Sequence, residues 1–177
     1  MVIARVRMNK QTSDAYALAF KKLFTKCSRI NQVFEPGSAL LGVLTDWSDA
    51  ETNGLRQAVG KTVAEKLLKG CRVHWNRSCQ RVADRVARSN QEKDIFLKIC
   101  YMIPNLSTAI EVMACFETLY GVRPVSDLVK KLPKLQLSTG EVHFIEKECD
   151  WSIAKNWAQW WARCEHLKML SKVFTPM

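Results

Sequence analysis

The feature that most constrains the fold of this sequence is an apolar run, residues 39–44, followed at once by Thr45 and Asp46. Pro36 and Gly37 precede the run. Turn residues before such a run and an acid after it are typical of a short strand buried on both faces of a parallel sheet. In open α/β sheets, ligands and catalytic groups gather at the carboxyl ends of the strands, which is where Asp46 would lie.

A second short apolar segment, residues 67–73, follows the first. Between the two segments, Ser48 or Asp49 can cap a helix that Gly60 ends. A strand, a helix and a second strand make one βαβ unit, so we expect the two strands to be parallel neighbours.

The chain before this unit predicts a strand and a helix. Residues 2–8 alternate in character with the period of two that a strand shows. Thr12 or Ser13 can cap a helix that reaches Cys27, with apolar residues at helical spacing. The polar face of this helix carries Lys21, Lys22 and Lys26.

Composition narrows the class of protein. The chain has 177 residues, 47% of them hydrophobic, which is enough for one sizeable core. Seven scattered cysteines without a secretory signal favour reduced thiols inside the cell, and no stretch is long and apolar enough for a membrane span. The formal charge of +10 favours an anionic partner, nucleic acid or membrane surface.

Residues 75–89 predict a two-faced helix. Four arginines fall within an arc of roughly 80°: Arg77, Arg81, Arg85 and Arg88. The opposite side is apolar, with Trp75, Cys79, Val82 and Val86. Asp84 is the one acid in the segment, so most of the arginines lack an acidic partner at i,i+4 spacing. The arginine face can bind phosphates, and the alternative is an ordinary solvated face.

The remainder of the chain predicts helices without clear strands. Three segments have helical spacing and end signals: residues 94–102, 107–120 and 125–132. Residues 136–145 are ambiguous between a small hairpin and a loop. Trp151, Trp157, Trp160 and Trp161 follow at short spacings, which favours the packed face of a helix over a base-stacking platform.

Three residues are candidates for chemistry. Asp46 could act in catalysis and hold a divalent cation, although such sites combine two or three carboxylates; the alternative is a turn residue at a strand end. Cys71 and His74 form a Cys-x-x-His pair, which is half of a zinc site. The nearest second pair, Cys164 and His166, has poor spacing, so zinc is not favoured. Nucleophilic catalysis by Cys71 is favoured still less, because nothing identifies an orienting group.

Three motifs occur together in a characteristic order: Leu44-Thr45-Asp46, Ser48-Asp49-Ala50, and Gly70-Cys71-Arg72-Val73-His74-Trp75 with Arg77 and Gln80 after it. This order and spacing resemble the catalytic core of Mutator-like element (MULE) transposases. The resemblance implies a ribonuclease-H-like fold in which two Asp and one Glu hold magnesium or manganese for hydrolysis and strand transfer on DNA. It makes Asp46 the second catalytic Asp, and Cys71 and His74 the family's Cys-x-x-His signature.

The resemblance also predicts an incomplete α/β domain. Residues 1–89 would be a partial ribonuclease-H-like core of about three strands, and residues 90–177 a helical insertion region. The family's first Asp would precede Met1 and its Glu would follow Met177, with Glu148 and Glu165 outside any family context. We therefore expect no transposition or nuclease activity from this chain alone. An unpaired strand edge would recruit a protein partner or a second chain.

The resulting interpretation is a fragment or remnant of a MULE-type DNA transposase that acts in the nucleus and retains nucleic-acid binding. One alternative is a non-enzymatic DNA-binding or regulatory protein derived from such an element. Another is a basic, mostly helical scaffold unrelated to transposition. A parallel strand pair with Asp46 at its carboxyl edge favours the first two, and an all-helical bundle favours the third.

Overall fold

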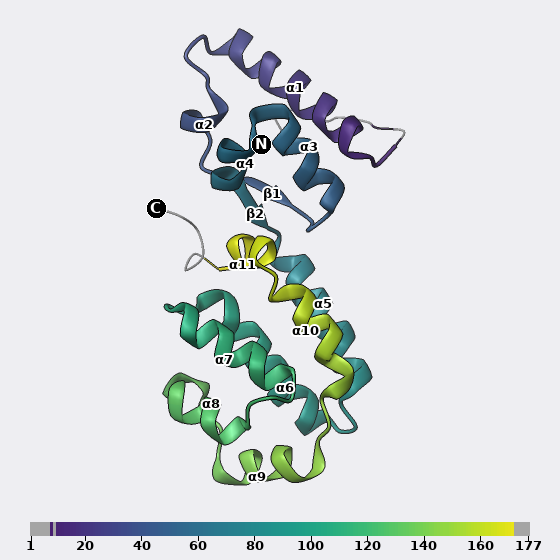
Figure 1. Cartoon of the computed structure of the whole chain (residues 1–177), viewed down its shortest axis with the longest axis vertical. Coiled ribbons are helices and arrows are strands. Elements are labelled where there is room, and N and C mark those ends of the chain that lie inside the picture. Colours follow the sequence, from purple (N-terminus) through teal and green to yellow (C-terminus); the bar gives the residue numbers. More distant parts are fainter. Residues whose placement is uncertain (1–7, 9, 172–177) are drawn as a thin grey trace. The chain divides into compact units, whose positions relative to one another are not determined.

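The computed structural model describes Met8 and residues 10–171 of the chain, which form two compact units (Figure 1). The first unit ends at Cys71 and the second begins at Arg72. The sequence predicts a boundary between residues 89 and 90 instead, which differs from the observed boundary by the length of one helix. The strand expected over residues 2–8 lies, apart from Met8, outside the described residues.

The first unit is mostly helical and contains one small sheet (Figure 1). Its elements are α1 (Ser13–Ile30), α2 (Pro36–Ala39), β1 (Val43–Thr45), α3 (Asp49–Val59), α4 (Lys61–Leu67) and β2 (Leu68–Gly70). Thr12 caps α1 and Ser48 caps α3, each by accepting a backbone N–H with its side-chain oxygen, and Gly60 ends α3. Helices α1 and α3 and their caps confirm the sequence prediction.

Helices α1 and α3 pack at close range because Gly54 has no side chain. A Cβ at Gly54 would lie 2.4 Å from the Cβ of Tyr16 and 3.0 Å from the backbone nitrogen of Ala17. Gly54, Ala17 and Leu55 are buried. The interface between α1 and α3 is therefore a backbone-to-backbone approach that a larger residue would force apart.

Strands β1 and β2 are parallel neighbours, with Val43 opposite Leu68 and Thr45 opposite Gly70. This pairing confirms the predicted βαβ arrangement, although two helices rather than one connect the strands. The prediction of a short strand buried on both faces is wrong. Residues 36–39 form α2, and Leu41 and Leu44 are 100% and 68% exposed, because no described element packs over their side chains.

The second strand is also shorter than predicted. Gly70 is its last residue, and α5 starts at Arg72, so Cys71 and Val73 are not part of a strand. Trp47 fixes this end of the sheet: its indole ring occupies the space in front of Gly70, and its Nε1 donates to the Cys71 carbonyl at 3.1 Å. Trp47 has φ 74°, which is uncommon for a bulky residue.

The second unit is helical throughout its described part. Its helices are α5 (Arg72–Val86), α6 (Asn90–Met102), α7 (Ala109–Leu119), α8 (Val125–Lys131), α9 (Thr139–Glu148), α10 (Lys155–Trp161) and α11 (Cys164–Leu170). Short 3₁₀ turns occupy Ile103–Asn105, Pro133–Leu135 and Ser152–Ala154. The helical predictions for this region are confirmed, with the α7 cap at Thr108 rather than Ser107.

Helix α9 replaces the hairpin or loop expected over residues 136–145. Ser138 Oγ accepts the Glu141 N–H, and the Glu141 carboxylate accepts the Ser138 N–H, which completes a capping box. This Ser-x-x-Glu signal was present in the sequence. The two reciprocal bonds satisfy backbone donors at the start of α9, so the segment is helical.

Aromatic rings fill the core of the second unit. Trp75 is fully buried and lies edge-on to Trp161 at 4.7 Å and stacked with Trp157 at 5.6 Å between ring centroids. Trp160 stacks on His166. The prediction that the tryptophans pack in the protein interior is confirmed for Trp151 and Trp161, which are buried.

Three cysteines lie in the same core, on α5, α6 and α7: Cys79, Cys100 and Cys115. All seven cysteines are free thiols. Burial raises the pKa of Cys115 to about 12 and that of Cys100 well above its usual range. Within the described residues, no helix combines the length and apolar character of a membrane span.

Candidate nucleic-acid interface

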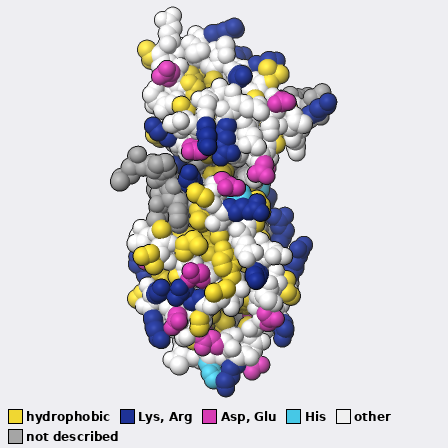
Figure 2. All heavy atoms as spheres, viewed as in Figure 1, with side chains coloured by type: hydrophobic (Ala, Val, Ile, Leu, Met, Phe, Trp, Pro, Cys, Tyr) yellow, Lys and Arg dark blue, Asp and Glu magenta, His cyan; other side chains and the backbone are white. Residues whose placement is uncertain are grey.

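Helix α5 presents a line of exposed arginines. Arg77, Arg81 and Arg85 recur every fourth residue, so they lie on one side of the helix along about 12 Å of its axis. All three are exposed. Figure 2 shows Lys and Arg side chains along the margin of the second unit where Figure 1 draws α5. We call Arg77, Arg81 and Arg85 the arginine face.

The opposite side of α5 is anchored in the core. Trp75, Cys79 and Val86 are buried there. Ser78 Oγ accepts a hydrogen bond of 2.9 Å from Trp157 Nε1, which connects α5 to α10. Because this side is fixed by packing and by a side-chain hydrogen bond, the arginine face is directed to solvent on a rigid element.

The one acid on α5 is engaged elsewhere. Asp84 forms an ion pair of 2.6 Å with Lys93 of α6 and accepts a hydrogen bond from Gln80. The hydrogen bond from Lys93 is the largest cause that lowers the pKa of Asp84. None of the three arginine side chains forms an ion pair or a hydrogen bond within the described part of the chain. Their charge is therefore uncompensated.

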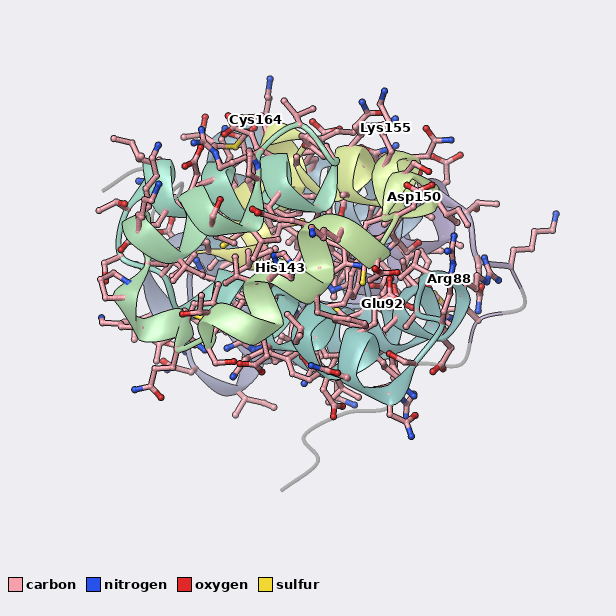
Figure 3. All side chains as sticks on the ribbon, turned by 90° about the horizontal axis from the view of Figure 1, so that it is seen from below. Arg88, Glu92, His143, Asp150, Lys155 and Cys164 are labelled. Atoms are coloured by element: carbon pink, nitrogen blue, oxygen red, sulfur yellow. The ribbon has the colours of Figure 1, made fainter. Side chains whose placement is uncertain are left out.

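Arg88 does not share this face, although the sequence groups it with the other three. Helix α5 ends at Val86, and the Arg88 N–H donates to Glu92 Oε2 at 2.8 Å. The pKa of Asp150 is lowered first by the hydrogen bond from the Ser152 N–H and also by nearby Arg88. Figure 3 shows Arg88, Glu92 and Asp150 at one corner of the unit. The helical face thus has three arginines.

Asp46 follows β1 directly and is exposed. Its Oδ1 accepts the Ser48 N–H at 3.1 Å, and its own N–H donates to Glu51 Oε2 at 3.0 Å. Burial raises the pKa of Glu51; the bond from the Asp46 N–H opposes this rise and the Asp46 carboxyl adds to it. The geometry is that of a turn residue that leads into the cap of α3.

The residues at this strand end do not fit a divalent cation. Asp46 and Glu51 are two carboxylates that already accept backbone N–H groups within one turn, those of Ser48 and Asp46, whereas divalent-cation sites of this kind combine two or three carboxylates directed at one point. No group of three metal-ligating side chains occurs in the described chain. The structure therefore supports no catalytic step through a metal at Asp46.

Cys71 and His74 do not form part of a described metal cluster either. The Cys71 N–H donates to the Thr45 carbonyl at 2.8 Å and its carbonyl accepts from Trp47, so its backbone closes the end of the sheet. His74 is exposed in the first turn of α5. At about 100° per residue it falls on the same side as Arg81 and Arg85.

The sequence interpretation missed two side-chain partnerships at these sites, those of Glu51 with the Asp46 N–H and of Lys93 with Asp84. The Glu51 carboxylate reaches back from α3 and accepts the Asp46 N–H. Lys93 was not singled out, although it neutralises Asp84 from α6. The pairing of Lys93 with Asp84 had no signal in the sequence, because it depends on how α6 packs beside α5. Ser48 and Glu51, in contrast, match the Ser-x-x-Glu pattern, in which the Glu side chain turns back over the start of its helix.

Known proteins add no further support for an assignment. No protein-family model, curated protein or solved structure matches this chain significantly.

Proposed function

We propose that this chain binds nucleic acid by placing the arginine face of α5 against the phosphate backbone. Guanidinium groups suit phosphate oxygens because their planar donors form charge-assisted, bidentate hydrogen bonds. A line of three such groups makes contacts that position the protein on a duplex without reading its sequence. The binding is therefore strongly dependent on salt.

One observation carries this proposal: the only acid on α5 is paired with Lys93, and the arginines have no partner among the described residues. An ordinary solvated helix face mixes both signs of charge, which lowers its field. Here, the fixed carboxylate on α5 has its own cation at 2.6 Å. The field of the arginine face is left available to an anionic partner.

The proposal also includes the evolutionary origin of this chain. The parallel pair β1 and β2, with Asp46 after the carboxyl end of β1 and basic α5 after β2, supports derivation from a MULE-type transposase with a partial ribonuclease-H-like core. This arrangement also favours such a derivation over an unrelated helical scaffold. Catalysis is not part of the proposal, because the described residues around Asp46 do not assemble three metal-ligating side chains.

The test is binding of the full chain to a short mixed-sequence DNA duplex across a salt series. The variant R77A/R81A/R85A is compared with K131A/K134A/K147A, a control that removes the same charge from exposed residues of α8, α9 and the turn after α8. We expect the α5 variant to reduce the slope of log affinity against log salt by about one per arginine. Equal effects of the two variants would contradict the proposal.

A further inference from the structure

Helix α1 carries a second line of exposed cations, in the first unit. Lys22, Lys26 and Arg29 are separated by four and three residues, so they lie on one side of the helix. All three are exposed, and none has an ion pair or hydrogen bond within the described part of the chain. We call these residues the α1 cationic face.

Acids do not offset this face from within α1. Asp14, in the first turn, is the one acid of the helix. It lies about 12 Å along the axis from Lys22, which exceeds a Debye length at physiological ionic strength. Figure 2 shows Lys and Arg side chains at the top of the view, over the region where Figure 1 draws α1.

The opposite part of α1 is fixed by its packing against α3. Ala17 is buried, and Gly54 allows the backbones to approach. Lys22, Lys26 and Arg29 project from a helix whose exposed large apolar residues, Leu18 and Ile30, are twelve positions apart and form no continuous apolar side. Helices that lie on a membrane need an apolar side to bury in the lipid, so a nucleic acid fits this surface better than a bilayer does.

We propose that the α1 cationic face is a second surface that binds the phosphate backbone of a nucleic acid. This inference rests on the proposed function and extends it to the first unit. The two lysines act as point charges toward the phosphate backbone and the arginine as a bidentate donor, so the contact is independent of base sequence. Each phosphate neutralised releases counterions and steepens the salt dependence.

The experiment uses the full chain and the variant K22A/K26A/R29A, with K131A/K134A/K147A again as the control of equal charge. Alanine preserves helix propensity, and circular dichroism verifies that helix content is unchanged. We expect the α1 variant to reduce the slope of log affinity against log salt by about 2.7, and the control to leave it nearly unchanged.

The outcomes separate this inference from the proposed function. If the α1 variant has the same slope of log affinity against log salt as the control, and R77A/R81A/R85A has a smaller slope, the second surface is refuted. The proposed function then survives. If the α1 variant alone loses slope, the second surface stands and the role of α5 fails. Loss of binding to phosphatidylserine vesicles, with DNA binding intact, would identify the face as a lipid contact and overturn the inference.

Discussion

Glu92 Oε1 accepts a hydrogen bond from Trp151 Nε1 at 3.1 Å and so joins α6 to the segment that follows α9. Glu92 is only 1% exposed, and its other oxygen accepts the Arg88 N–H. Burial raises the pKa of Cys149 to about 12, and the hydrogen bond to Glu92 contributes to this rise. A buried carboxylate therefore accepts donors from two separate stretches of the second unit, the turn before α6 and the segment after α9.

Replacing Glu92 by Gln should destabilise the protein. The amide keeps one acceptor oxygen but turns an NH₂ group toward one of the two N–H donors, which leaves buried donors unpaired. We expect a loss of about 1–3 kcal/mol in the free energy of unfolding, measured by chemical denaturation. Glu148→Gln, at an exposed position on α9, should change it by less than about 0.5 kcal/mol; similar values for both variants would contradict this account.

Gly54→Ala should separate α1 from α3. The new methyl would overlap the Cβ of Tyr16 at 2.4 Å, so we expect a loss of about 1–3 kcal/mol. Gly140→Ala is the matched control, since no atom lies within 4 Å of a Cβ at Gly140 and the residue is in the first turn of α9. That control should be neutral or stabilising by up to about 1 kcal/mol. Thermal unfolding measures both.

Gly70→Ala should disturb the end of the sheet for reasons of space rather than backbone conformation. A Cβ at Gly70 would meet the indole ring of Trp47 at 1.9 Å. The ring cannot move away freely, because its Nε1 donates to the Cys71 carbonyl. We expect a loss of about 1–3 kcal/mol or more and a changed tryptophan fluorescence; an unaltered spectrum with full stability would refute the contact.

Glu51→Gln should change the pH dependence of stability. The folded-state pKa of Glu51 is raised, chiefly by burial. Its contribution to stability is therefore complete below the ordinary pKa of a glutamate and is lost as pH rises through the raised value. Gln resembles the protonated form, so the variant should gain stability relative to the parent between acid and neutral pH. Denaturation curves give the free energy of unfolding of both proteins at each pH across that range. If the reasoning is wrong, the parent and the variant would show the same dependence of this free energy on pH.

Helices were predictable where a cap and an apolar period coincide. Thr12 and Ser48 mark the starts of α1 and α3, and Gly60 ends α3, since each acts through atoms close by in the sequence. Helix α9 could have been predicted from Ser138 and Glu141 by the same reasoning. Local hydrogen bonds thus account for most of what the sequence revealed about the fold.

The predictions that failed depended on burial rather than on local bonds. The run at residues 39–44 has the apolar character of a buried strand, yet only Val43 and Leu44 of it are in β1, and Leu44 is exposed. An apolar run does not reveal whether neighbouring elements cover it. The arginine face was predictable from helical spacing, whereas the pairing of Asp84 with Lys93 was not.

The rate at which the thiols of Cys79, Cys100 and Cys115 are modified reports how often the core of the second unit opens. All three thiols are buried, so alkylating reagents reach the sulfurs slowly; the raised pKa values of Cys100 and Cys115 also reduce their reactive thiolate form. Exposed Cys164 reacts without any opening. The delay between its modification and that of the three core sulfurs therefore records how often helices α5, α6 and α7 come apart.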